Sequence, residues 1–264
     1  MSIIEAILIA IVEGLTEFLP ISSTAHMVIT SSIMKLADDP FTKYYEICIQ
    51  FGAIISVLVL YYKKFINFKS PTFYLKLIVA VIPSLFFGYL LNDFIDSKLE
   101  SPLFIAIVMI LGGIVLLFVD KWFNKPTIQD EKEINYTLAL KIGLFQCLSI
   151  LFPGLSRSAA TIIGGMSQKI AKDVAAEFSF FLAVPTMAAA TLYKTLTYIK
   201  DEGFFSSEQL IVLLVGNAVA FIVALLAIKF FIDFVKKNGF RIFGLYRIVL
   251  GSIVLLLIAF KIIS

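Results

Sequence analysis

The stretch EGLTEFLPISSTAH, residues 13–26, gathers polar chemistry in an otherwise apolar chain. It holds two carboxylates, a proline, three consecutive hydroxyls and the only histidine. Glu13 and Glu17 are four residues apart, so a helix presents both on one face. Pro20 ends that helix, and the hydroxyls after it favour the start of a second one. Because a helix start offers free N–H groups and a partial positive charge, the stretch is typical of a phosphate site.

Composition predicts an integral membrane protein. Of the 264 residues, 60% are hydrophobic, and the mean hydropathy is +0.97. Soluble domains run at about 45–50% apolar residues by a similar count. The net charge of +3 is small and gives no reason to expect nucleic acid as a partner. The two cysteines, Cys48 and Cys147, lie in apolar runs and are expected to be buried thiols rather than a disulfide.

The hydropathy pattern divides the chain into two similar halves. In the first half, apolar residues 3–19 and a short helix at 23–34 read as a re-entrant hairpin, because neither segment is a clean span of about 20 residues. Three spans follow, at about 44–62, 73–91 and 103–119. The second half repeats the plan, with an apolar run at 137–152, a short helix opened by LSRSAATIIGGM, and spans at about 174–198, 209–232 and 241–262.

Matching positions around the two breaks indicate an internal repeat. Glu13 lies seven residues before Pro20, and Gln146 lies seven before Pro153. An odd number of spans in each half inverts the second half relative to the first. We therefore expect one all-α membrane domain with inverted topology, in which each half is a re-entrant helical hairpin plus three transmembrane helices, six spans in total. Its parts are the first repeat at 1–119, a polar linker at 120–136 and the second repeat at 137–264.

Lysines in the predicted loops are distributed unevenly between the two sides of the membrane. The side opposite the N-terminus receives ten, and the N-terminal side five. Cytoplasmic loops carry the excess of Lys and Arg, so both termini and the mouth of the first hairpin are expected outside the cytoplasm. The ten are Lys63, Lys64, Lys69, Lys121, Lys125, Lys132, Lys169, Lys172, Lys236 and Lys237; the five are Lys35, Lys43, Lys98, Lys200 and Lys261.

Ionisable residues in apolar segments are costly and are usually functional. Glu13 and Glu17 offer the carboxylate oxygens that Mg²⁺ or Ca²⁺ prefers, although a pairing with another helix is the alternative. His26 has the chemistry of a general acid or base, although a hydrogen-bonded core histidine is the alternative. Arg157, in the second break, suits a guanidinium clamp on phosphate oxygens, although a snorkelling arginine is the alternative.

Further polar residues are candidates for binding a phosphorylated substrate. Thr161 follows Arg157 by four residues and could face the same site. Gln50 lies within an apolar span, where an interhelical hydrogen bond is the alternative. The hydroxyls at the two helix starts belong to Ser22, Ser23 and Thr24 in the first hairpin and to Ser156 and Ser158 in the second.

The motifs EGLTEFLPISSTAH and PGLSRSAAT (153–161) resemble the two signatures of the bacterial undecaprenyl-diphosphate phosphatase family, also called the bacitracin-resistance family. EICIQFGAI (46–54) and EFSFFLAVP (177–185) resemble their repeat partners, so the resemblance covers essentially the whole chain. One position departs from the family pattern, since Ala25 stands where the family commonly has glycine.

The resemblance implies removal of the terminal phosphate of undecaprenyl diphosphate in the bacterial plasma membrane, at an outward-facing site stimulated by a divalent cation. The monophosphate product is the lipid carrier for peptidoglycan synthesis, and its recycling confers bacitracin resistance. The family assigns catalysis to Glu13, Glu17, Ser23, His26 and Arg157. We expect Ser23 to attack phosphorus and His26 to accept its proton, with attack by water or by His26 left open.

A secondary transporter or carrier of a phosphate-bearing anion is the alternative, because inverted repeats with half-helix starts facing an anion also build transporters. An acid pair beside Ser23 and His26 favours the enzyme. The expected partners are the isoprenyl diphosphate lipid and membrane lipids. The sequence leaves a homodimer open.

Overall fold

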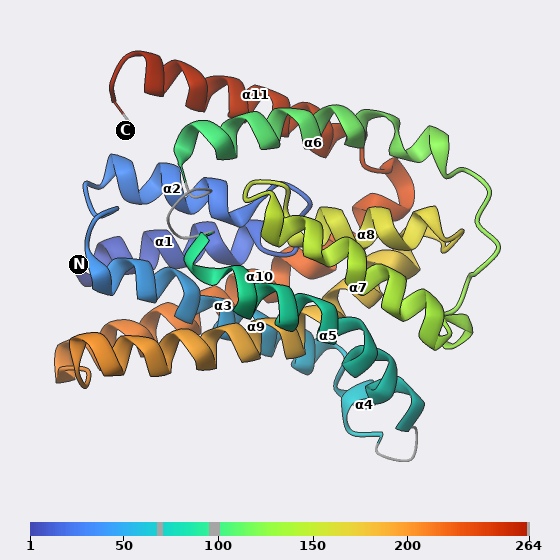
Figure 1. Ribbon diagram of the computed structural model, residues 1–264, viewed down its shortest axis with the longest axis horizontal. Coiled ribbons are helices and arrows are strands. Elements are labelled where there is room, and N and C mark those ends of the chain that lie inside the picture. Colours follow the sequence, from blue (N-terminus) through green and yellow to red (C-terminus); the bar gives the residue numbers. More distant parts are fainter. Residues whose placement is uncertain (68–70, 95–100, 263–264) are drawn as a thin grey trace.

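The protein is an all-α bundle in the computed structural model, which describes residues 1–67, 71–94 and 101–262, with side chains omitted at 92–94 (Figure 1). The helices of the first half are α1 Ile3–Thr16, α2 Ser23–Ile33, α3 Pro40–Leu60, α4 Tyr62–Phe65, α5 Pro71–Phe94 and α6 Pro102–Trp122. Those of the second half are α7 Tyr136–Leu151, α8 Arg157–Ser167, α9 Lys172–Glu202, α10 Ser207–Asn238 and α11 Arg241–Ala259. A 3₁₀ turn, Glu131–Glu133, lies in the linker.

Local sequence explains where the helices begin. Ser2 and Ser206 form capping boxes with Glu5 and Gln209, which satisfies N–H groups that a helix start leaves unpaired. Asp39 and Ser101 cap α3 and α6, and each is followed by a proline in the first turn, where its missing N–H does no harm.

Six of the described helices are long and apolar enough to cross a membrane: α3, α5, α6, α9, α10 and α11. They coincide with the six predicted spans, so that prediction is confirmed. Helix α6 continues to Trp122, past the predicted linker start at residue 120, because Asp120 and Lys121 can remain helical where their side chains reach the aqueous boundary. Cys48 and Cys147 are free thiols, as expected; Cys147 is buried, whereas Cys48 is only partly buried.

The two hairpins enter the bundle from opposite ends (Figure 1). Helices α1 and α2 lie toward the end that holds both termini, and α7 and α8 lie toward the other end. Helix α1 packs against α10 of the second half, and α7 packs against α5 of the first half. Helices α3 and α9 pair across the halves, as do α6 and α11. This exchange of partners is what an inverted repeat requires, and the repeat itself stays a prediction.

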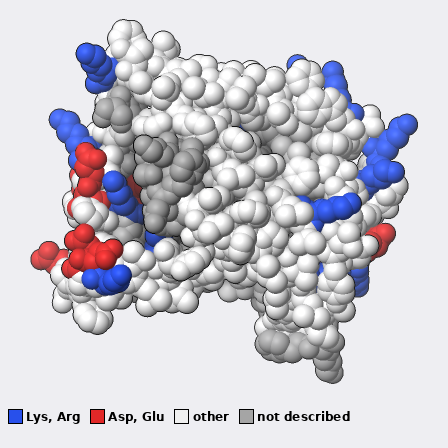
Figure 2. Space-filling view, in the orientation of Figure 1, with Lys and Arg blue, Asp and Glu red and all other residues white. Residues whose placement is uncertain are grey.

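Charged side chains gather at the two ends of the molecule and leave an uncharged band between them (Figure 2). The end with both termini mixes acidic and basic groups, and the opposite end is mainly basic in this view. This arrangement agrees with a protein that crosses the membrane several times. Lys69 and Lys98, which entered the charge count, lie outside the described residues.

The core joins the first hairpin to the second half. Phe18, in the turn after α1, is fully buried and packs edge-to-face on Phe180 of α9, with ring centroids 5.2 Å apart. Phe180 in turn contacts Phe231 of α10. Because a buried aromatic ring fixes the backbone that carries it, Phe18 holds its neighbour Glu17 in place.

Candidate active site

The short helices α2 and α8 begin in the same way. Their caps, Ser22 and Ser156, adopt φ of 70° and 74°, a left-handed region that side chains rarely occupy. Each cap side chain accepts a hydrogen bond from the backbone N–H three residues later. Directly after these caps, Ser23 and Arg157 are the first residues of two 11-residue helices. One hairpin thus places a hydroxyl where the other places a guanidinium.

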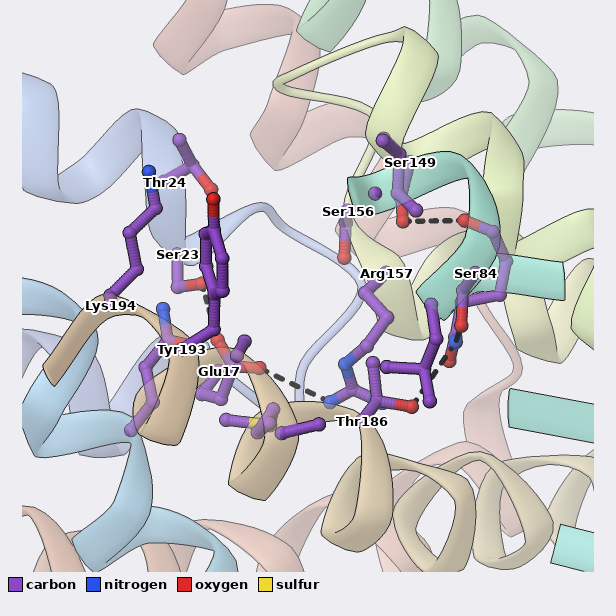
Figure 3. Close-up of a pocket in the computed structure, with 18 of the residues that line it drawn as sticks. Glu17, Ser23, Thr24, Ser84, Ser149, Ser156, Arg157, Thr186, Tyr193 and Lys194 are labelled. Atoms are coloured by element: carbon purple, nitrogen blue, oxygen red, sulfur yellow. Dashed lines mark hydrogen bonds and ion pairs between the residues drawn. The ribbon is translucent and has the colours of Figure 1, made fainter. Parts of the chain in front are cut away.

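Glu17 joins these two residues (Figure 3). The Ser23 hydroxyl donates a hydrogen bond of 2.5 Å to Glu17 Oε2, and Arg157 Nη2 lies 3.2 Å from Glu17 Oε1. Arg157 Nη1 also donates to the carbonyl oxygen of Ser179 at 3.1 Å. Both partners of the ion pair are largely buried. A nucleophile candidate and a phosphate-binding candidate therefore contact one carboxylate, although they are 134 positions apart in the sequence.

A cavity of about 560 Å³ opens beside this carboxylate. Seven residues that the sequence singled out line it: Glu17, Ser22, Ser23, Thr24, Gln50, Ser156 and Arg157. Its apolar lining includes Leu85, Gly88, Ile150 and Met187. A cavity that is mostly apolar with a few convergent polar groups suits a ligand with a charged head and a hydrocarbon tail.

The cavity also holds polar residues that the sequence argument did not select. Gln146 Nε2 donates to Ser84 Oγ at 2.6 Å and to Thr186 Oγ1 at 3.2 Å. The repeat alignment had matched Gln146 to Glu13, which was a signal that it belongs at the centre. Lys194 and Tyr193 of α9 line the cavity beyond Glu17 (Figure 3). A lysine within the predicted apolar span 174–198 is itself a signal of a functional role.

Two predicted binding residues stay outside the cavity. Ser158 donates to the carbonyl oxygen of Leu19 at 2.8 Å and so ties α8 to the turn of the first hairpin. The Thr161 hydroxyl lies 2.6 Å from the Ser179 hydroxyl of α9. Both side chains are fully buried. In this structure their hydroxyls contact the first hairpin and α9 instead of lining the cavity.

His26 does not face Ser23. Its Nδ1 lies 2.7 Å from the carbonyl oxygen of Ser22, and its Nε2 lies 2.7 Å from the hydroxyl of Tyr246 on α11. The imidazole and phenol rings are nearly parallel, 3° apart. Both ring nitrogens of His26 therefore contact groups other than the Ser23 hydroxyl. The group that accepts from the Ser23 hydroxyl in this structure is Glu17, not the histidine that we expected.

Glu13 lies one turn before Glu17 on α1 and is fully buried. Neither of its carboxylate oxygens has a hydrogen-bond partner within the described residues. An orphaned buried carboxylate next to a second one fits a hard cation. Across the residues that the structure describes, no three acidic, histidine or cysteine side chains form a complete metal site. A cation here would therefore need further ligands from substrate or water.

Arg247 of α11 was missed entirely by the sequence argument, and it is fully buried. Its guanidinium donates to the carbonyl oxygens of Pro20 at 3.2 Å, Leu155 at 2.6 Å and Gly154 at 2.9 Å. Its Nε also donates to Met109 of α6 at 3.3 Å. Arg247 thus joins the turns of both hairpins to the α6–α11 pair. An arginine inside the predicted apolar span 241–262 is itself a signal of a functional or structural role, but the sequence does not show which groups it contacts.

The fold and the cavity define a multi-pass membrane protein whose polar site is built jointly by two helical hairpins. The family model of the bacitracin resistance protein BacA matches residues 6–253, and the chain belongs to this family. A relative from Flavobacterium johnsoniae is 55% identical over 97% of this chain and 96% of its own length. One from Flavobacterium psychrophilum is 56% identical over 98% of this chain and 97% of its own length. One from Porphyromonas gingivalis is 51% identical over 97% of each chain. All three are named undecaprenyl-diphosphatase.

Proposed function

We propose that the protein hydrolyses undecaprenyl diphosphate to undecaprenyl phosphate and inorganic phosphate, and so recycles the lipid carrier for peptidoglycan synthesis. The observation that carries this proposal is the Glu17 carboxylate, which contacts both Ser23 and Arg157 beside a largely apolar cavity. It is also supported by the names of relatives that are more than half identical to this chain. The bacitracin resistance associated with the family follows from the same recycling.

The first chemical step is transfer of the terminal phosphoryl group to Ser23. The Ser23 oxygen attacks the terminal phosphorus, its proton passes to Glu17, and the bridging oxygen leaves with its electron pair on undecaprenyl phosphate. When Glu17 accepts the proton, it loses its charge and no longer neutralises Arg157. The guanidinium then offers its full charge, in a bidentate geometry, to the phosphoryl oxygens.

The second step releases inorganic phosphate. Water attacks the phosphoserine, and the Ser23 oxygen leaves with its electron pair and recovers a proton from Glu17. The protons of the water depart with inorganic phosphate. Direct attack of water on the diphosphate, or of His26, remains the alternative chemistry. The bonds of His26 to Ser22 and Tyr246 favour a positioning role for that residue.

Glu13 and Glu17 are the residues that would hold Mg²⁺ or Ca²⁺. When bound, such a cation offsets the charge of the diphosphate, whose oxygens commonly complete the coordination of Mg²⁺. The unpartnered oxygens of Glu13 support this assignment.

The bacterial inner membrane is the proposed location, with the cavity open toward the extracytoplasmic side. The excess of lysines at the end opposite the termini supports this orientation. A homodimer stays a prediction from the sequence.

Release of phosphate by the purified protein tests the function. Undecaprenyl diphosphate in detergent should be consumed with one phosphate released per lipid, and Ser23→Ala should abolish most of this release. A folded wild-type protein that binds the lipid without releasing phosphate would support the transporter alternative, which nothing in the site favours.

A further inference from the structure

A second cavity lies at the end of the molecule opposite the termini. Its volume is about 570 Å³, and it forms where α6 and α10 end and α9 and α11 begin. None of its lining residues is shared with the cavity at Glu17. The proposed phosphatase reaction gives it no role.

Basic side chains from four helices converge on this second cavity: Lys121 of α6, Lys172 of α9, Lys237 of α10 and Arg241 of α11. Within the described part of the chain, none of the four has an ion pair or a hydrogen bond from its side-chain nitrogens. Two helix starts and two helix ends meet here, so their dipoles largely cancel. The side chains themselves therefore set the charge of the cavity.

The two acidic residues of the lining are already engaged. Asp120 Oδ2 accepts a hydrogen bond of 2.7 Å from the backbone N–H of Phe240. Asp173 accepts from the N–H of Val174 and lies 3.8 Å from Lys236, which is outside the lining. Four basic groups against two acidic ones leave an excess of positive charge in the lining.

The level of the cavity relative to the membrane points to a lipid ligand rather than to a free ion. Trp122 follows Lys121 directly, is 58% exposed and stacks on Phe118 of the outer surface. Exposed tryptophan is enriched at the level of lipid headgroups. The lining of the cavity includes Leu117 and Phe123, which offer an apolar surface for acyl chains. Asn124 and Asn238 add neutral polar groups to the lining.

We propose that this second cavity binds the phosphate headgroup of an anionic phospholipid from its own leaflet. Basic pockets between transmembrane helices recognise such headgroups, and the cytoplasmic leaflet, to which the lysine distribution assigns this end, is rich in them. The four basic side chains grip the phosphate, and the acyl chains follow the apolar surface of α6. The bound lipid would tie the α6–α11 pair to α9 and α10.

Native mass spectrometry of the purified full chain tests the proposal, with phosphatidylglycerol as the probe and phosphatidylcholine as the neutral comparison. The double variant Lys121→Gln/Arg241→Gln should weaken binding of phosphatidylglycerol by about tenfold or more. The matched control Lys63→Gln/Lys132→Gln removes the same charge at the same end without touching the cavity lining. The control should bind phosphatidylglycerol like the wild type.

Two results would overturn the proposal. Equal loss of binding in the control would show general attraction to the basic end instead of a site. Displacement of phosphatidylglycerol by an equal concentration of inorganic phosphate would show that the occupant is a free anion. Phosphate release by the double variant in micelles of neutral detergent should match the wild type, which verifies that the fold is intact.

Discussion

The guanidinium of Arg247 donates a hydrogen bond of 3.2 Å to the carbonyl oxygen of Pro20, at the break of the first hairpin. The same nitrogen donates to Leu155, at the break of the second hairpin. A rigid guanidinium thus fixes the two turns relative to each other. Ser23 and Arg157 follow these turns by three and two residues, so their spacing depends on a residue that touches neither of them.

Replacing Arg247 should therefore damage both stability and turnover. Arg247→Met leaves the carbonyl oxygens of Pro20, Gly154 and Leu155 without this donor. Each buried group left unsatisfied costs about 1–3 kcal/mol of stability. Thermal unfolding in detergent and phosphate release should both report the loss. Lys229→Met on α10, with an exposed side chain outside both cavities, is the control and should unfold like the wild type.

Gly112 gives an independent test of the role of Arg247 in holding the two hairpin turns together. A Cβ at this position would collide with Arg247 Nη2, although alanine is the better helix former. Gly112→Ala should lower kcat while Arg247 itself is retained. Ile114→Ala, at a half-exposed position on the same helix, should not. Wild-type kcat in Gly112→Ala would contradict the positioning role.

The composite site predicts a non-additive response to substitution. Ser23→Ala and Arg157→Lys should each lower turnover by about 10²–10³ or more, because each removes one group from the same phosphoryl transfer. The double variant should be little worse than the poorer single variant. Ser252→Ala, an exposed hydroxyl bonded within its own helix, is the control. Fully multiplicative losses would mean that Ser23 and Arg157 act in separate steps.

Glu17, rather than His26, is expected to accept the Ser23 proton. Glu17→Gln should therefore lower kcat at least as much as Ser23→Ala does. His26→Gln and Tyr246→Phe should have similar, smaller effects, because they break the same hydrogen bond. The shape of the pH–rate profile should be retained in His26→Gln. Loss of its acidic limb in that variant alone would identify the histidine as the base.

Removal of divalent cations should stop turnover, and added Mg²⁺ or Ca²⁺ should restore it. Glu13→Gln replaces a buried carboxyl group that has no hydrogen-bond partner among the described residues. It should raise the Mg²⁺ concentration needed for half-maximal activity while the protein stays folded. An unchanged Mg²⁺ response in this variant would leave Glu13 with a structural role only.

Orientation in the membrane can be read from cysteine labelling in intact cells. Phe204→Cys lies at the end with both termini and Lys125→Cys at the opposite end, and both positions are exposed. An impermeant thiol reagent should label position 204 and leave position 125 unmodified. The reverse pattern would show the opposite orientation in the membrane, with the Glu17 cavity facing the cytoplasm.

The sequence by itself determined the membrane class, the six spans and the two broken hairpins. These follow from local physics: a span needs about 20 apolar residues, a proline interrupts a helix, and a hydroxyl caps the next one. The same local rules brought out Glu17, Ser23 and Arg157, because charged and hydroxyl groups beside a helix break are unusual within an apolar chain. Their family resemblance then gave the substrate.

Only the tertiary structure decided which groups meet. His26 turns toward Tyr246 of α11, 220 positions away, while Ser23 turns toward Glu17. Gln146 and Ser84 reach the cavity from helices of different halves, and Arg247 reaches both hairpin turns from the last span. Helical periodicity specifies which residues share a face. Which face meets which neighbour depends on packing between helices far apart in the chain, and that packing made one site from two hairpins.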